Sequence, residues 1–201
     1  MMLDTFEVRL QDGLEADEIA NFFNPRNVYA LREMLAYYAT ISQSPENILA
    51  MIAILDYAKL PSMEKFNFIF RNFIAQGCRY ELNIGSDLRR RLNDARQNLV
   101  APDPASYRSS RGRIVIAPYR VNIPLPAGFF DINGLYVHLL TDIGEAYGRF
   151  VAAFTREDKG FTYVRHVDVT GNRLASEVKE FMLQMLHAGF SISPKLMRLD
   201  S

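Results

Sequence analysis

Few residues of this chain have the types that carry covalent or metal chemistry, and they are scattered. The histidines are His138, His166 and His187, and the single cysteine is Cys78. His166 and Asp168 would share one face of a strand, but the sequence offers no third ligand beside them. Cys78 has no histidine nearby in sequence to act as its base, and no glycine-rich phosphate loop follows an expected strand. The sequence therefore predicts no metal site, no cofactor and no catalytic nucleophile.

A second set of polar residues is of the kind that contacts a protein partner. It comprises Ser44, Glu46, Asn47, Asn83, Glu145 and Arg149. Each member also has an ordinary explanation. The first three belong to the first turn of an expected helix, where the dipole favours an acid, and an asparagine often turns a loop. The last two would form an i,i+4 pair worth about 0.2–0.5 kcal/mol.

The elements that must position these residues are mainly helices. Apolar residues at helical spacing predict helices at 27–38, 63–75, 86–99 and 174–188. Residues 48–58 are apolar on nearly every side, so we expect their helix in the middle of a bundle. We expect Ser44 to cap that helix with Pro45 in its first turn. Ser62 and Gly77 should begin and end the following one.

Composition changes near residue 100, where proline, serine and glycine become frequent. Alternating residues at 113–116 and 120–123 predict two short strands inside this segment. A helical pattern resumes at 131 and continues to 154 with breaks near Gly144 and Gly148. Residues 161–169 alternate and predict a further strand.

We therefore expect a mainly α fold, α+β overall, in three parts. The parts are a lead-in at 1–26, a helical bundle at 27–155 interrupted by a small β insertion at 100–129, and a βα extension at 156–201. We expect the extension to pack on the same domain as the bundle.

The charge balance limits the possible partners. The 201 residues include 23 basic and 23 acidic ones, so nothing indicates the basic surface that nucleic-acid binding needs. The longest apolar run, 48–55, is too short to span a bilayer, and the N-terminus lacks a basic region and a long apolar stretch. A single cysteine suits a reducing compartment. These features predict a cytoplasmic protein without a transmembrane segment.

Three segments, in order, resemble the regulator-of-G-protein-signalling (RGS) family. They are SPENI at 44–48 with Asp56-Tyr57 further on, IFRNFI at 69–74 with ELNI at 81–84, and EAYGRF at 145–150 after Phe130-Asp131. The resemblance covers roughly residues 27–155 and implies an RGS-like helical bundle. It departs from the family at Ala50 and Met51, where an aromatic pair is common, and at Glu145, where aspartate is usual.

The resemblance implies a partner surface for a Gα-type GTPase. Ser44, Glu46, Asn47, Asn83, Glu145 and Arg149 would converge on the switch loops of that GTPase. Such a domain supplies no arginine finger, because Gα carries that arginine itself. It accelerates hydrolysis by binding the transition-state conformation of the switches better than the ground state. Asn83 would lie beside the glutamine that orients the attacking water.

Two alternatives remain open from the sequence. The chain could be an RGS-like scaffold or adaptor without GTPase-activating activity, since the insertion at 100–129 could cover the contact face. It could also be an enzyme whose site lies in the β-containing part, which would require a polar pocket lined by His138 or His166.

Overall fold

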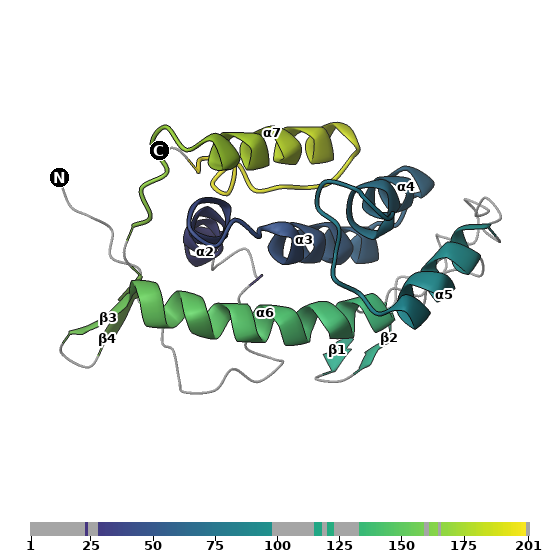
Figure 1. The fold of residues 1–201 in the computed structure, drawn as a ribbon, viewed down its shortest axis with the longest axis horizontal. Coiled ribbons are helices and arrows are strands. Elements are labelled where there is room, and N and C mark those ends of the chain that lie inside the picture. Colours follow the sequence, from purple (N-terminus) through teal and green to yellow (C-terminus); the bar gives the residue numbers. More distant parts are fainter. Residues whose placement is uncertain are drawn as a thin grey trace.

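The structure is a computed structural model that describes Phe23 and residues 28–97, 115–117, 120–122, 133–158, 161–164 and 166–199. The fold is mainly helical, which confirms the coarse fold class predicted from the sequence (Figure 1). Its elements are α2 (Val28–Thr40), α3 (Glu46–Lys59), α4 (Met63–Ile69) with a π-helical turn η2 (Phe70–Ile74), α5 (Ser86–Gln97), β1 (Val115–Ala117), β2 (Arg120–Asn122), α6 (Asn133–Phe154), β3 (Thr155–Asp158), β4 (Phe161–Val164) and α7 (Arg173–His187).

Helix α3 lies in the middle of the bundle, as its apolar pattern predicts. Nine of its 14 residues are buried, among them Leu49, Ile54 and Tyr57. Helices α6 and α7 lie on opposite sides of α2 and α3, and α4 lies beyond the far end of α3 (Figure 1). Burying one large apolar side chain contributes about 1.5–3 kcal/mol. The enclosure of α3 therefore contributes strongly to the stability of the core.

Helix α7 belongs to the same core as the helices before it. It contacts α2, and its residues Val178, Phe181 and Met182 are buried. The Phe181 ring lies 5.5 Å from the ring of Phe68 and 4.5 Å from that of Tyr80. The sequence after residue 166 therefore completes the bundle rather than trailing from it.

Two buried acids fasten neighbouring elements to one another. Asp56 of α3 accepts a hydrogen bond from Lys65 of α4 at 2.7 Å, and Lys65 also donates to the carbonyl of Leu60 at 3.1 Å. Glu33 of α2 accepts from the backbone N–H of Val167 at 2.7 Å and lies 3.2 Å from Nδ1 of His166. These contacts hold α4 on α3, and the segment before α7 on α2.

The helix boundaries follow the predicted signals in part. Ser62 caps α4 by accepting from the N–H of Lys65 at 3.2 Å, and Gly77 has a φ of 73° after the helical segment, so both predictions are confirmed. Ser44 does not cap α3. Pro45 occupies the N-cap position without a side-chain hydrogen bond, because the turn places Ser44 against α2 instead.

Helix α6 runs unbroken through Gly144 and Gly148, so the predicted breaks are wrong. A glycine inside a helix costs only about 1 kcal/mol, and burial of Leu139, Ile143 and Phe150 outweighs that cost.

The strands form two separate antiparallel pairs. β1 pairs with β2, and β3 pairs with β4. The strand expected over 161–169 ends at Val164, and residues 166–169 are held by α2 instead of a strand partner. Most of residues 1–26 and 100–129 lie outside the described residues, so the lead-in and the β insertion stay predictions.

Removing the ammonium group of Lys65 should destabilise the bundle strongly. Lys65→Ala leaves the buried Asp56 without its counter-ion, and we expect a loss of about 3–5 kcal/mol in the free energy of unfolding. Urea unfolding monitored by circular dichroism measures it. Lys59→Ala, at the exposed end of α3, is the control and should change stability by less than about 0.5 kcal/mol. A similar loss in both variants would contradict a special role for the buried pair.

Candidate functional site

The turn between α2 and α3 carries the first candidate residues. The backbone N–H of Ser44 donates to the carbonyl of Tyr38 at 2.9 Å, which folds the turn back on the end of α2. Gln43, just before it, has a φ of 55°, a left-handed conformation that few residues other than glycine adopt. The turn presents Ser44, Glu46 and Asn47 as half-buried residues at one end of α3.

Glu46 is an acid held in unfavourable surroundings. Burial raises the pKa of Glu46 above its ordinary value of 4.5, and a hydrogen bond from its own backbone N–H offsets only part of that effect. Perturbed pKa values cluster at functional sites. Glu46 is therefore a candidate functional residue, because its ionised form costs the folded chain stability.

Asn83 lies exposed on a loop whose backbone is fixed on both sides. The N–H of Leu82 donates to the carbonyl of Phe73 at 2.8 Å, and the Arg89 guanidinium donates to the carbonyl of Leu82 at 3.0 Å. Arg89 also forms an ion pair with Glu81 at 2.9 Å. An exposed amide on a fixed loop can hydrogen-bond to a partner at little entropic cost.

Tyr80 stands three residues before Asn83 and is buried against Phe73 and Phe181. Burial is the largest cause of its raised pKa; the charge of Arg79 lowers this pKa, and the charges of Glu177 and Glu46 raise it further. The charge of Glu46 therefore acts on the segment that leads to Asn83.

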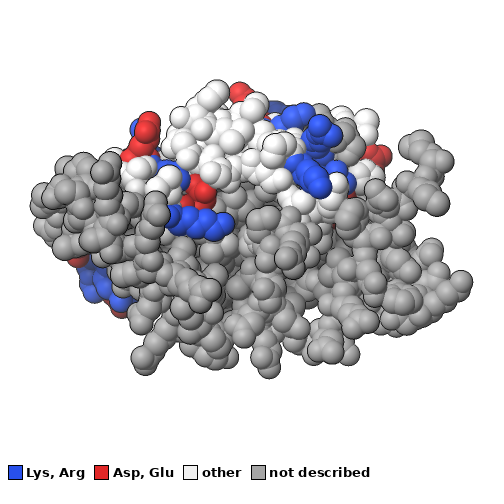
Figure 2. Space-filling model, turned by 180° about the vertical axis from the view of Figure 1, so that it is seen from behind, with Lys and Arg blue, Asp and Glu red and all other residues white. Residues whose placement is uncertain are grey.

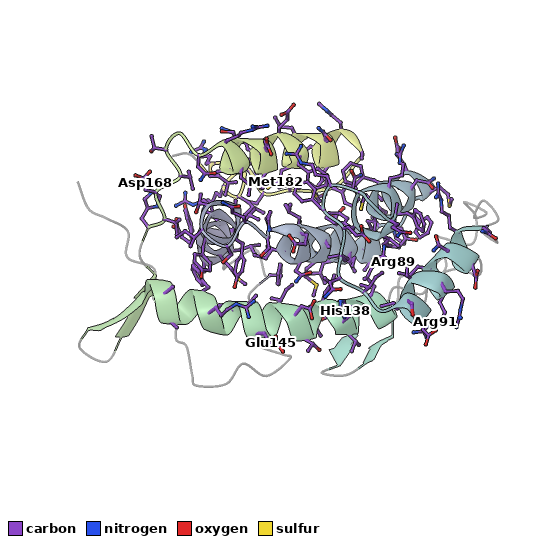
Figure 3. All side chains as sticks on the ribbon, viewed as in Figure 1. Arg89, Arg91, His138, Glu145, Asp168 and Met182 are labelled. Carbon is purple, nitrogen blue, oxygen red and sulfur yellow. The ribbon has the colours of Figure 1, made fainter. Side chains whose placement is uncertain are left out.

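Glu145 and Arg149 both lie exposed on α6. They share a helical face but form no ion pair with each other in the described structure, so the i,i+4 explanation does not account for them. Figure 3 shows Glu145 on the side of α6 that points away from α2 and α3. Burial raises the pKa of Tyr38, and the charge of Arg149, three residues beyond Ala146 on α6, offsets part of that rise.

The structure therefore relates most, but not all, of the predicted residues. The N–H of Ser44 donates to the carbonyl of Tyr38, and the Tyr38 hydroxyl donates to the carbonyl of Ala146, three residues before Arg149 on α6. The charge of Glu46 acts on the pKa of Tyr80, three residues before Asn83. Glu145 is the exception, because it faces outward (Figure 3). Tyr38 was missed from the sequence, since its position fits the apolar pattern of α2 and nothing nearby distinguishes it from a core residue.

The described surface does not point to another kind of site. In Figure 2, basic and acidic side chains of the described residues lie interspersed on the face that is shown. Within residues 28–97, 133–158 and 166–199, no three His, Cys, Asp or Glu side chains are grouped to hold a metal ion. Among the described helices, none has the length and apolar character needed to cross a membrane.

Comparisons with known proteins give no match: no protein-family model, no curated protein and no solved structure resembles this chain closely enough to be counted.

Replacing Glu46 by glutamine should stabilise the free protein at neutral pH. Because the folded state raises the pKa of Glu46, ionisation lowers stability as pH rises from the ordinary value of 4.5 through the raised one. Glu46→Gln should therefore unfold at higher urea concentration at pH 7, and this advantage should vanish below pH 4.5. Glu180→Gln, on the exposed face of α7, is the control. A loss of stability at pH 7 would contradict the assignment.

Cys78 should react slowly with thiol reagents. Burial raises the pKa of the Cys78 thiol, and the charge of Glu81 raises it further, so little thiolate forms at neutral pH. Labelling with a chromogenic disulfide reagent at pH 7.5 should be slower than for free cysteine and should accelerate in urea. Gln76→Cys in a Cys78→Ser background supplies an exposed thiol for comparison. Equal rates at the two positions would contradict the prediction.

Proposed function

We propose that this chain is an RGS-like cytoplasmic protein that binds the switch regions of a Gα-type GTPase and accelerates GTP hydrolysis. The observation that carries the proposal is the meeting of the α2–α3 turn with α6 at Tyr38. The backbone carbonyl of Tyr38 accepts from the N–H of Ser44 at 2.9 Å, and its hydroxyl donates to the backbone carbonyl of Ala146, three residues before Arg149. The first and third of the segments that resemble the family are thereby related in space as well as in order.

The chemistry of the surface supports this proposal. Gα switch loops offer backbone and side-chain hydrogen-bonding groups. The site presents a half-buried carboxylate at Glu46, an exposed amide at Asn83 and an exposed guanidinium at Arg149. None of these groups needs to carry out a chemical step. They would act by fitting the transition-state form of the switches better than the ground state.

Single-turnover GTP hydrolysis by a panel of Gα subunits tests the proposal directly. We expect at least one Gα to hydrolyse GTP faster with the protein present, and to bind it in the GDP–aluminium fluoride state in preference to the GDP state. Absence of both effects across the panel would overturn the proposal.

Asn83→Ala should weaken the acceleration. Removal of a hydrogen-bonding group used mainly in the transition state should lower the rate enhancement by about tenfold, equivalent to ~1.4 kcal/mol. Asn93→Ala, which removes another exposed amide on α5, should have no effect. Binding that survives Asn83→Ala, without any acceleration, would instead favour the adaptor alternative. Deletion of residues 100–129 would then be expected to abolish that binding.

A further inference from the structure

Asn83 stands at the centre of a tight backbone turn. The N–H of Ile84 donates to the carbonyl of Leu82 at 2.9 Å, a bond that closes a three-residue γ-turn around Asn83. Among the described residues other than glycine, only Gln43 has a positive φ, so the turn at Asn83 is of the inverse, less strained type. The Asn83 side chain is exposed on this turn. Its direction therefore depends on whether the carbonyl of Leu82 stays in place.

That carbonyl is also held by Arg89 of α5. The Arg89 guanidinium donates to the carbonyl of Leu82 at 3.0 Å and to the carbonyl of Ile74, the last residue of η2. A carbonyl oxygen has two lone pairs. In Leu82, one hydrogen bond comes from the N–H of Ile84 and the other from Arg89. The acceptor capacity of the group that precedes Asn83 is thus fully used.

The carboxylate of Glu81 completes the set of contacts. Its Oε1 pairs with Arg89 at 2.9 Å, and its Oε2 accepts from the N–H of Gly77 at 2.7 Å. The side chain of Arg89 is only 20% exposed, so water competes little for these contacts. A planar guanidinium can donate several hydrogen bonds in a fixed geometry. Arg89 therefore ties the end of η2 to the loop on either side of Glu81.

The position of Arg89 on its helix shows that α5 itself gains little from it. Helix α5 begins at Ser86, so Arg89 lies in the first turn, where the helix dipole disfavours a cation. The next residue, Arg90, has a side chain that is 71% exposed and pairs with Asp87 at 2.9 Å on the same helix. The contacts of Arg89 are instead with the loop before α5.

We propose that Arg89 is a positioning residue, whose guanidinium holds the turn at Asn83 so that the exposed amide meets the GTPase in one orientation. The identity of the partner rests on the proposed function. The holding of the turn is a property of the free protein, so the two can fail separately.

Amide hydrogen exchange of the free protein tests the positioning without any GTPase. Arg89→Lys keeps the positive charge but lacks the planar fork that reaches two carbonyls and a carboxylate. The N–H of Ile84 should then exchange about tenfold faster, as expected when a hydrogen bond from a charged group is lost. The N–H of Ile54, which is fully buried in α3, should change far less.

Arg90→Lys is the matched control, because it makes the same substitution at the exposed neighbour on the same helix. It should leave the exchange rates of Ile84 and Ile54 unchanged. An unchanged rate at Ile84 in Arg89→Lys would overturn the inference. Equal acceleration at Ile84 and Ile54 would also overturn it, because Arg89 would then stabilise the whole fold rather than the turn.

Single-turnover GTP hydrolysis tests the consequence for function, with a Gα as the probe and this protein at saturating concentration. Arg89→Lys should lower the acceleration about fivefold in the natural background, but about twofold or less in Asn83→Ala, because the arginine acts through the asparagine. Arg90→Lys should have no effect. Equal effects of Arg89→Lys in both backgrounds would contradict the inference. If no Gα responds, the proposed function fails, and the exchange rate of Ile84 still decides whether Arg89 holds the turn.

Discussion

The arrangement of the helices follows from one constraint, which is that other elements must cover α3 and keep it from water. A helix with apolar residues on almost all sides can leave water only if other elements cover it from several directions. Helices α4 and α6 contact it, and α7 lies on the side opposite α6 (Figure 1). That arrangement brings segments from both halves of the chain to the start of α3, where Glu46 and Asn47 provide its most polar turn. The position of the candidate site thus follows from the packing of the core.

Apolar packing alone would leave the helices free to slide, and directional contacts remove that freedom. Asp56 with Lys65 sets the angle between α3 and α4, while Glu33 fixes the approach to α7. A buried ion pair often contributes less to stability than well-packed apolar side chains would. It forms only when the two charged groups have the right distance and orientation, so it restricts how the helices can pack. Tyr38 has the same effect between α2 and α6.

The sequence predicted the features that depend on local chemistry or on overall hydrophobicity. The buried position of α3, the cap at Ser62 and the turn at Gly77 all follow from residue types alone. The continuity of α6 through its glycines could not be predicted, because tertiary burial decided it. Neither could the hydrogen bond of the Tyr38 hydroxyl, since its acceptor is a backbone carbonyl 108 residues away in sequence. A hydrogen bond to a distant backbone carbonyl leaves no trace in residue spacing.

The place of α7 in the core also affects how the protein can fold as it is synthesised. Phe68 and Phe73 belong to the first half of the chain, but both rings contact Phe181 of α7. Until the ribosome has released that helix, part of their surface lacks its native cover. The emerging chain therefore exposes apolar surface that favours a provisional cluster or binding to a chaperone. The native core can close only after α7 has been made.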